Sequence, residues 1–312
     1  MNDFSPNVTF YRPSGAASPA GILLTLVMGT IAGVVLACIY AFVNYHDPIL
    51  YLNVLLVGLF GLAMGWVVSK GIHKYRIRNT IAAGFIALVV FIVAYGVHWV
   101  AYAAVAWADL DDMPYDFAYI FEVFKAFLLE PEALWGFVQD IYTHGLWTIT
   151  SGSSKNGQSV NGVFLLGIWA AEALGILYYT LKSPLEETRK PYSERTEEWL
   201  TATEMPLPVA FIEDVEAFKA ALGRNDYSAL TTPLPPVAEG ETADGQQGHA
   251  VVTLYSDPFE PCVSVHNVSV KVKKKKADTK TKEVVRYLKV SPSVAQNIAS
   301  ALGGNSTPGS QL

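Results

Sequence analysis

Lysine and arginine are absent from four long apolar stretches of this chain. Each stretch is close to the roughly 20 apolar residues that the hydrocarbon core of a bilayer demands. Apolar runs of this length without a basic residue predict transmembrane helices. The four predicted spans are residues 21–43, 49–69, 81–107 and 163–181.

Cysteine is also scarce, because the 312 residues contain only Cys38 and Cys262. Cys38 falls within the first predicted span and Cys262 in a part of the chain that we expect in the cytosol, so the two cannot easily form a disulfide. The chain also lacks a phosphate-binding P-loop, a dinucleotide-binding fingerprint, a zinc-protease helix motif and a nucleophile elbow. We therefore assign no catalytic residue, no metal site and no cofactor from the sequence.

Basic residues gather instead in two connections, and these predict the orientation of the chain. One group lies between the second and third spans and the other follows the fourth span, whereas residues 44–48 contain no Lys or Arg. Short loops rich in Lys and Arg stay in the cytoplasm. We therefore expect both termini in the cytosol and residues 108–161 outside. The basic residues behind this prediction are Lys70, Lys74, Arg76, Arg78, Lys182, Arg189, Lys190 and Arg195.

The predicted outer loop, residues 108–161, mixes acidic and aromatic residues with two helical patterns. Apolar residues recur at helical spacing across residues 115–129, and Pro131 suits the first position of a second helix that ends at His144-Gly145. We expect two short amphipathic helices that lie along the outer surface of the bilayer or cap the bundle. A plain extracytoplasmic helical hairpin is the alternative. Residues 151–159 are rich in Ser, Gly and Asn and predict a loop.

The chain becomes polar after Lys182, and residues 182–302 are long enough for one small cytosolic α+β domain. Apolar residues alternate or recur there in the patterns that are typical of strands and helices. They predict an antiparallel sheet with accompanying helices. The predicted helices are residues 211–222 and 292–302, and the predicted strands are residues 250–255, 262–273 and 284–290.

Other features of the polar segments are less regular. The valines of the second predicted strand shift from odd to even positions, which predicts a bulge near His266-Asn267. Residues 1–15 lack the basic start of a cleavable signal peptide, so we expect residues 1–20 to be a cytosolic N-terminal segment before a retained first span. Residues 231–248 hold too much Pro, Gly and Glu for regular structure, and residues 303–312 predict a disordered tail.

Glu172 lies in the middle of the fourth predicted span. An ionisable group at that depth is costly and indicates a function by default. Glu172 is one residue away from a stripe of small residues, Gly167, Ala171 and Gly175, so we expect it to face protein or a wet cavity. A proton or cation site is one interpretation, and a protonated, hydrogen-bonded structural residue is the other.

His98 and Asn53 are the other polar candidates at bilayer depth. His98 lies in the outer half of the third span beside Tyr95 and Trp99, where a lone histidine is typical of a satisfied core residue. Asn53 lies near the outer end of the second span and is a candidate hydrogen-bond partner for His98 across the bundle.

Pairs of glycines four residues apart occur in the first two spans, at Gly29 and Gly33 and at Gly61 and Gly65. Such motifs let two helices approach closely. Packing inside one four-helix bundle explains them, and so does self-association. The number of small-residue faces in so few spans favours a homo-oligomer.

A run of lysines lies between the last two predicted strands. The predicted domain is tethered to the inner leaflet, so anionic lipid headgroups are attractive partners, at about 1 kcal/mol for each lysine near the surface. Nucleic acid is not expected, because no aromatic residues interrupt the run and no binding motif is present. A solvated hairpin tip is the alternative. The candidate lipid- or partner-binding residues are Lys271, Lys273, Lys274, Lys275 and Lys276.

Residues 131–172 carry one resemblance. The stretch begins with Pro-Glu-Ala-Leu-Trp, continues with Gly-Leu-Trp-Thr-Ile at residues 145–149, and ends with Trp-Ala-Ala-Glu at Glu172. It resembles a pattern in uncharacterised bacterial multi-pass membrane proteins. The resemblance implies a bacterial inner membrane and a shared setting for Trp147, Trp169 and Glu172, and it implies no activity.

The patterns together favour a membrane all-α fold, a four-helix transmembrane bundle with an extracytoplasmic amphipathic helical cap, plus the small cytosolic α+β domain. We expect a scaffold or sensor whose cytosolic domain binds a protein partner or the membrane lipids. An oligomeric ion channel or proton-coupled transporter built on Glu172 and His98 is an alternative, although four spans without an inverted repeat are few for a transporter. An integral membrane enzyme is a third possibility. Its site would be formed by His98, Glu172 and the acidic residues expected at the outer surface, which are Asp47, Asp109, Asp111 and Asp112.

Overall fold

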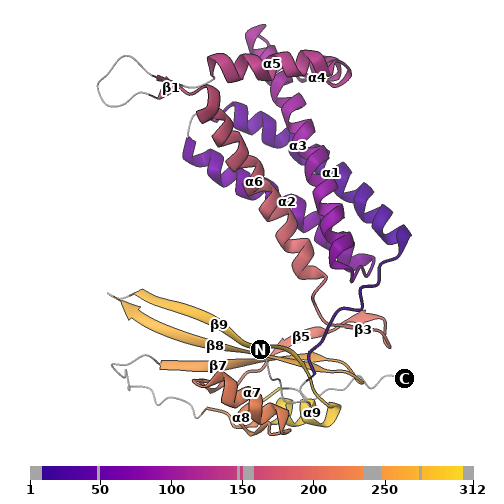
Figure 1. Cartoon of the computed structure of the whole chain (residues 1–312), viewed down its shortest axis with the longest axis vertical. Helices are drawn as coiled ribbons and strands as arrows, with labels where there is room; N and C mark the ends of the chain where they lie inside the picture. Colours follow the sequence, from indigo (N-terminus) through magenta and orange to yellow (C-terminus); the bar gives the residue numbers. More distant parts are fainter. Residues whose placement is uncertain are drawn as a thin grey trace. The chain divides into compact units, whose positions relative to one another are not determined.

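The computed structural model describes residues 9–47, 50–145, 148–149, 158–234, 247–273 and 276–304. The chain forms two compact units (Figure 1). The helical unit comprises residues 14–189, and the sheet unit joins residues 190–312 with residues 1–13. Several predicted features lie outside the described residues, namely Trp147, most of the loop at 151–159, much of the segment at 231–248, Lys274, Lys275 and most of the tail at 303–312.

Four long helices make up most of the helical unit and coincide with the four predicted spans. They are α1 (Pro19–Tyr45), α2 (Leu50–Lys74), α3 (Thr80–Leu110) and α6 (Gly162–Glu187). All four are long and apolar enough to cross a membrane. α2 and α6 continue past the predicted ends at residues 69 and 181, because a lysine ends the apolar stretch while remaining a good helix former.

Glycines set how closely the long helices pack. α1 packs against α3, and α2 packs against α6. A Cβ atom on Gly61 would lie 2.7 Å from the carbonyl oxygen of Ile176, and one on Gly65 would lie 2.7 Å from that of Tyr179. A Cβ atom on Gly29 would lie 2.8 Å from a side-chain methyl of Val90 on α3. The glycine pairs therefore serve contacts within one chain, and self-association stays a prediction.

The outward surface of the bundle is apolar. Along α1, large aliphatic side chains recur every four residues and are each roughly half exposed; they are Leu23, Val27, Ile31, Val35 and Ile39. Soluble proteins rarely expose a continuous apolar stripe of this length. Such a stripe is typical of a helix that faces lipid.

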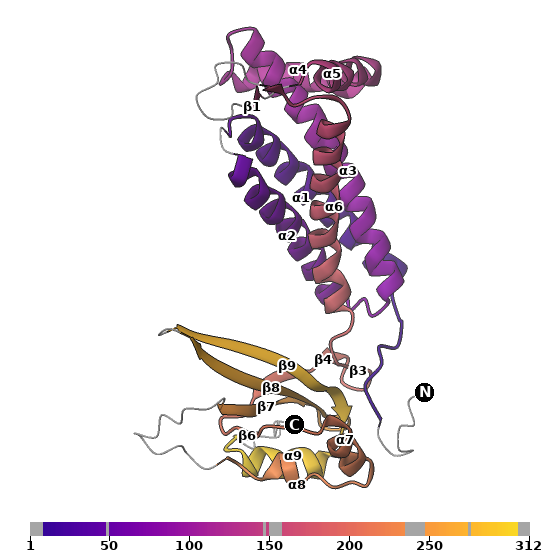
Figure 2. The ribbon, with the colours of Figure 1, turned by 60° about the vertical axis from the view of Figure 1, so that its left-hand side comes forward.

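Two short helices follow α3, as the pattern in the loop predicted. α4 (Phe117–Leu129) begins after Asp116, which accepts hydrogen bonds from the amides of residues 118 and 119, and α5 (Pro131–His144) starts on a proline. Both run across the end of the bundle where α3 ends (Figures 1 and 2). Phe127 and Ile141 are their buried residues, so each helix is fixed to the bundle by one apolar face.

The sheet unit holds an antiparallel sheet in the order β5 (Thr201–Glu204), β7 (Gln247–Ser256), β8 (Cys262–Lys273) and β9 (Lys276–Lys289), with β6 (Val209–Ala210) also paired to β7. Helices α7 (Val215–Gly223), α8 (Ser228–Thr231) and α9 (Pro292–Ala301) lie on one face of the sheet (Figure 2). The core between the helices and the sheet includes Leu230, Val265, Leu288 and Ile298, all at most 2% exposed. Short hairpins complete the described elements: β1 (Thr148–Ile149) with β2 (Gln158–Ser159), and β3 (Tyr192–Ser193) with β4 (Glu198–Trp199).

The bulge that the sequence predicted near His266-Asn267 of β8 lies close to that place, but on the neighbouring strand β9. The register between β7 and β8 runs unbroken from Gln247–Val270 to Tyr255–Cys262. Shifts occur only in the pairing of β8 with β9, between Val263 and His266, and the extra residues belong to β9. Tyr287 of β9 has a φ of 54°, as residues in bulges often do.

Asn267 explains why the valine pattern changed parity. It continues the inward-facing series of Val263 and Val265 and is 4% exposed. Its amide nitrogen donates to the carbonyl oxygen of Ile212 at 2.7 Å, and its amide oxygen accepts from the Ile212 backbone N–H at 3.0 Å. Ile212 is therefore held outside any helix, and α7 begins at Val215 and not at residue 211, after the N-cap Asp214.

The N-terminal segment belongs to the sheet unit. The backbone N–H of Lys289 donates to the carbonyl oxygen of Thr9 at 2.9 Å. The backbone N–H of Tyr11 donates to the carbonyl oxygen of Tyr287 at 2.8 Å. Residues 9–11 therefore extend the sheet along the free edge of β9. The sequence pattern of residues 1–20 gave no sign of this pairing, because the segment is too short to show strand periodicity.

Candidate functional site

A small polar cavity lies among the four long helices. Its volume is about 20 Å³. A cavity of this size has room for about one water molecule. All four long helices contribute to its wall, which is formed by Asn44, Asn53, His98, Trp99, Tyr102, Leu165, Trp169 and Glu172. The three polar residues that the sequence singled out at bilayer depth therefore meet in one place.

Glu172 is hydrogen-bonded across the bundle to Tyr40. The Tyr40 hydroxyl donates to Glu172 Oε1 at 2.7 Å, which joins α1 to α6. The Tyr40 ring stacks on Phe60 of α2, with centroids 4.6 Å apart and planes within 9°. Tyr40 is 4% exposed, so its hydroxyl has little access to other partners. Glu172 therefore accepts a buried hydrogen bond whose donor is held in place by aromatic stacking.

His98 is enclosed by aromatic rings and lies 2% exposed. Its ring centroid is 4.8 Å from that of Tyr40, 5.6 Å from Trp99, 5.7 Å from Tyr95 and 6.1 Å from Tyr102. Neither ring nitrogen has a hydrogen-bond partner among the described residues. An unsatisfied buried polar group costs about 1–3 kcal/mol. A ligand as small as water, held in the adjoining cavity, would reduce that cost.

Asn53 has a different partner from the one that the sequence suggested. Its side-chain nitrogen donates to Asn44 Oδ1 at 2.6 Å, which joins the C-terminal end of α1 to the start of α2. Asn53 and His98 share the cavity wall without a direct hydrogen bond. Tyr40 and Asn44 were missed, although their spacing of four residues places both on one face of α1 and was available as a signal.

A second polar contact ties the helices at the opposite end of the bundle. His73 Nδ1 of α2 lies 2.8 Å from Glu187 Oε1 of α6. Thr80 and Thr188 are hydrogen-bonded nearby, with their hydroxyl oxygens 3.2 Å apart. Glu187 is 8% exposed. Sequence reasoning assigned it to the soluble domain, because it follows the basic residue that ended the fourth predicted span.

Three of the five lysine candidates lie where β8 ends and β9 begins. Lys271 pairs with Asp278, and Lys273 pairs with Lys276, so these three lysines lie on adjacent strands at one end of the sheet. Lys274 and Lys275 lie outside the described residues. The role of all five lysines in binding stays a prediction.

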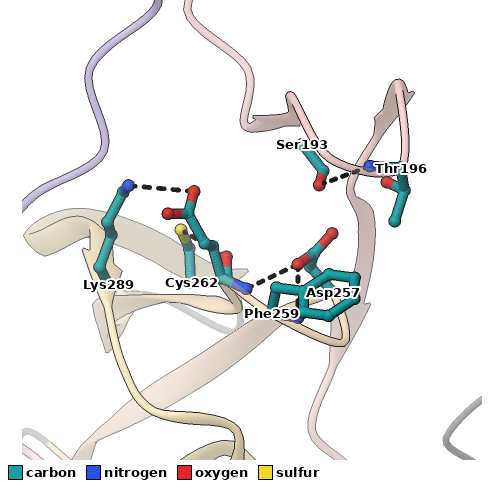
Figure 3. A network of polar contacts seen from close by, with 7 residues as sticks. Ser193, Thr196, Asp257, Phe259, Cys262 and Lys289 are labelled. Carbon is teal, nitrogen blue, oxygen red and sulfur yellow. Dashed lines mark hydrogen bonds and ion pairs between the residues drawn. The ribbon is translucent and has the colours of Figure 1, made fainter.

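A polar turn in the sheet unit holds the start of β8 (Figure 3). Asp257 Oδ1 accepts from the backbone N–H groups of Phe259 and Glu260, at 2.7 and 2.6 Å. Burial alone would raise the pKa of Asp257, but these amides and the Ser193 side chain outweigh it and lower that pKa. Lys289 also lies 3.2 Å from Glu260 Oε2.

Cys262 lies in the same turn region but does not have the properties of a reactive thiol. Burial raises the pKa of the Cys262 thiol to about 12. The thiol therefore stays protonated near neutral pH, whereas a nucleophilic cysteine needs a lowered pKa. Cys262 serves the packing of β8.

The described residues contain no group of three or more His, Cys, Asp or Glu that could hold a metal ion. Asp109, near the end of α3, instead accepts a hydrogen bond of 2.8 Å from the Tyr45 hydroxyl. No protein-family model, curated protein or solved structure matches this chain.

Proposed function

We propose that this chain is an integral membrane scaffold or sensor, in which the four long helices cross the bacterial inner membrane and the sheet unit binds a protein partner in the cytosol. The observation that carries the proposal is that the sheet unit is joined to both ends of the helical unit. Residues 9–11 pair with β9 just before α1, and the chain re-enters the sheet unit just after α6.

Because the sheet unit is connected to both the start of α1 and the end of α6, the long helices should cross the membrane an even number of times. The connection from Tyr11 to Pro19 covers at most ~3.6 Å per residue. It is thus shorter than the ~40 Å thickness of a bilayer with its headgroups. The start of α1 and the end of α6 therefore belong on the same side as the sheet unit. The basic residues between α2 and α3 and after α6 favour the cytosol as that side.

The face of the sheet opposite its described helices offers a surface for a protein partner. The described helices α7, α8 and α9 lie on the other face (Figure 2). On β9, Glu283 lies 3.7 Å from Arg286 and 4.0 Å from His266, and these side chains are about one-third to one-half exposed. Exposed ion pairs contribute only ~1 kcal/mol or less. Their charges therefore remain available to a partner of complementary charge.

Site-specific photo-crosslinking in native membranes tests this proposal. A photo-reactive residue at Glu283, on the sheet face opposite the described helices, is compared with one at Asn297, an exposed position on α9. We expect a discrete crosslinked protein from position 283 that Arg286→Glu abolishes, and none from position 297. No crosslink from position 283, or the same products from both positions, would contradict the scaffold proposal.

A proton-coupled transporter or channel is the second candidate, because Glu172 shares one small cavity with His98, whose ring nitrogens have no hydrogen-bond partner in the described part of the chain. The small size of that cavity argues against an open pore through a single chain. Proton flux into vesicles that contain the purified chain distinguishes the two functions. Flux that Glu172→Gln removes and Glu186→Gln preserves would favour transport, since Glu186 lies exposed near the end of the same helix. Proton flux no greater than in protein-free vesicles would exclude transport and favour the scaffold proposal.

A further inference from the structure

A second, much larger cavity lies between α3, α5 and α6. Its volume is about 760 Å³, within the range of cavities that hold small-molecule ligands. Its wall is almost wholly apolar and includes Gly96, Trp99, Leu134, Trp135, Leu166 and Trp169. Trp135 is 62% exposed and Leu166 is 52% exposed, so the cavity opens to the surface of the bundle.

The polar side chains of this cavity come from two of its three helices. Gln139 and Tyr142 belong to α5, the amphipathic helix at the end of the bundle, and Tyr95 belongs to α3. Its deepest residues along α6 are Ala170 and Ala173, which are small and apolar. Trp and Tyr are the side chains that proteins place at the headgroup level of a membrane. The cavity therefore has an amide and aromatic side chains beside α5, where a headgroup would lie, and a mainly apolar wall between α3 and α6, where a hydrocarbon chain would lie.

We propose that this cavity binds one acyl chain of a membrane phospholipid, with the headgroup beside α5 and the chain running between α3 and α6. An apolar cavity does not hold ordered water, because water there finds too few hydrogen-bond partners. An empty cavity also forfeits the dispersion contacts of its lining. A hydrocarbon chain supplies those contacts, and the bilayer supplies the chain at high concentration. The inference rests on the long helices crossing a bilayer.

A substitution at Gly96 tests directly whether the large cavity is open to a ligand. A Cβ atom added there would meet no other atom within 4 Å, although Gly96 lines the cavity. A large side chain at this position can therefore enter the cavity without first displacing the backbone. Gly167 on α6 is a matched control, because its added Cβ also meets no atom within 4 Å and it does not line the cavity.

The bound chain would also touch the wall of the polar site. Trp99 and Trp169 line both cavities, and their rings meet edge to face with centroids 4.9 Å apart. One side of this tryptophan pair faces Glu172 and His98, and the other side faces the proposed acyl chain. An acyl chain in the large cavity would therefore hold Trp99 and Trp169 in the position in which they separate it from the small cavity.

The test compares wild type, Gly96→Phe and Gly167→Phe, each as the full chain purified in mild detergent and washed free of loosely associated lipid. Native mass spectrometry then measures phospholipid retained per chain. We expect wild type and Gly167→Phe to retain one phospholipid and Gly96→Phe to retain at least tenfold less. Equal retention in all three, or none in wild type, would overturn the proposal.

A second measurement covers the case in which Gly96→Phe fails to fold. Wild-type chain is reconstituted with phospholipids brominated along the acyl chain, and tryptophan fluorescence is compared with that of a Trp99→Phe variant. We expect quenching of Trp99 that persists after dilution into unbrominated lipid, and immediate full recovery would overturn the proposal. Alkaline extraction of membranes tests the spanning helices separately, because a chain that resists extraction yet holds no lipid contradicts this inference alone.

Discussion

The hydroxyl of Tyr40 donates a hydrogen bond of 2.7 Å to Glu172 Oε1, across 132 residues of sequence. This contact joins the first and last of the four long helices at the edge of a small polar cavity. It places Glu172 inside the bundle and gives the acid a defined partner.

Removing the Tyr40 hydroxyl should destabilise the helical unit. Tyr40→Phe keeps the ring stacked on Phe60 but leaves Glu172 without its donor, at a cost on the order of 1–3 kcal/mol. Thermal unfolding of the full chain in detergent measures the loss. Tyr178→Phe is the control, because Tyr178 is 58% exposed on α6. Equal unfolding temperatures for the two variants would mean that the Tyr40 contact does not stabilise the bundle.

Glycine substitutions should separate helix packing from open space. Gly61→Ala puts a Cβ atom 2.7 Å from the Ile176 carbonyl oxygen, so α2 and α6 must move apart, at a cost of about 1–3 kcal/mol. Gly96→Ala meets no neighbour and gains helix propensity, up to about 1 kcal/mol. Unfolding in a graded denaturing detergent compares the two. A neutral Gly61→Ala would contradict the close approach of α2 and α6.

Asn267 should be essential for the sheet unit. Asn267→Ala leaves both the N–H and the C=O of Ile212 without their buried partner, and each orphaned group costs about 1–3 kcal/mol. Hydrogen exchange read by mass spectrometry should show the peptide that contains Ile212 losing protection at least tenfold. Asn297→Ala, at an exposed position on α9, should leave that peptide unchanged. Continued protection in Asn267→Ala would show that Ile212 is held by other contacts.

Asp257 should stabilise its turn in a pH-dependent way. Its pKa is lowered in the folded chain, so its contribution is present above the unfolded value, ~3.9. That contribution is lost as the pH falls through the folded value. Asp257→Asn should therefore speed proteolytic cleavage at the turn at pH 7, and this difference from wild type should shrink below about pH 4.

The control for this pH dependence is Glu204→Gln, on the exposed strand β5. It should cleave like wild type at both pH values, because the charge it removes lies outside the turn. A difference between wild type and Asp257→Asn that grew toward acid would have the opposite sign and would contradict the lowered pKa.

The long helices could be predicted from the sequence, because bilayer length and the exclusion of Lys and Arg act on each helix alone. The same holds for α4, α5 and α9, which helical spacing predicts, with a proline at the start of α5 and α9 and a glycine after α5. Strand β8 was predicted with its observed bounds, Cys262–Lys273. These features depend on short-range chemistry that a single stretch of sequence contains.

Pairings between distant segments could not be predicted in the same way. The partners of Glu172 and Asn53, the bond between Asn267 and Ile212, and the addition of residues 9–11 to β9 all depend on which elements come together in three dimensions. Glu172 was recognisable as a costly group at bilayer depth, but its donor Tyr40 is one of 16 tyrosines in the sequence. A polar residue at an inward strand position, such as Asn267, instead looks like a break in the pattern.

The most direct test of the account is which side of the membrane each connection occupies. Single cysteines are placed at Lys74, Met113 and Glu204 in a chain whose Cys38 and Cys262 are replaced by alanine, and intact cells are treated with a membrane-impermeant maleimide. The account predicts labelling at position 113 in intact cells, and at positions 74 and 204 only after the inner membrane is permeabilised. Labelling of positions 113 and 204 from the same side would contradict the four crossings and the cytosolic sheet unit.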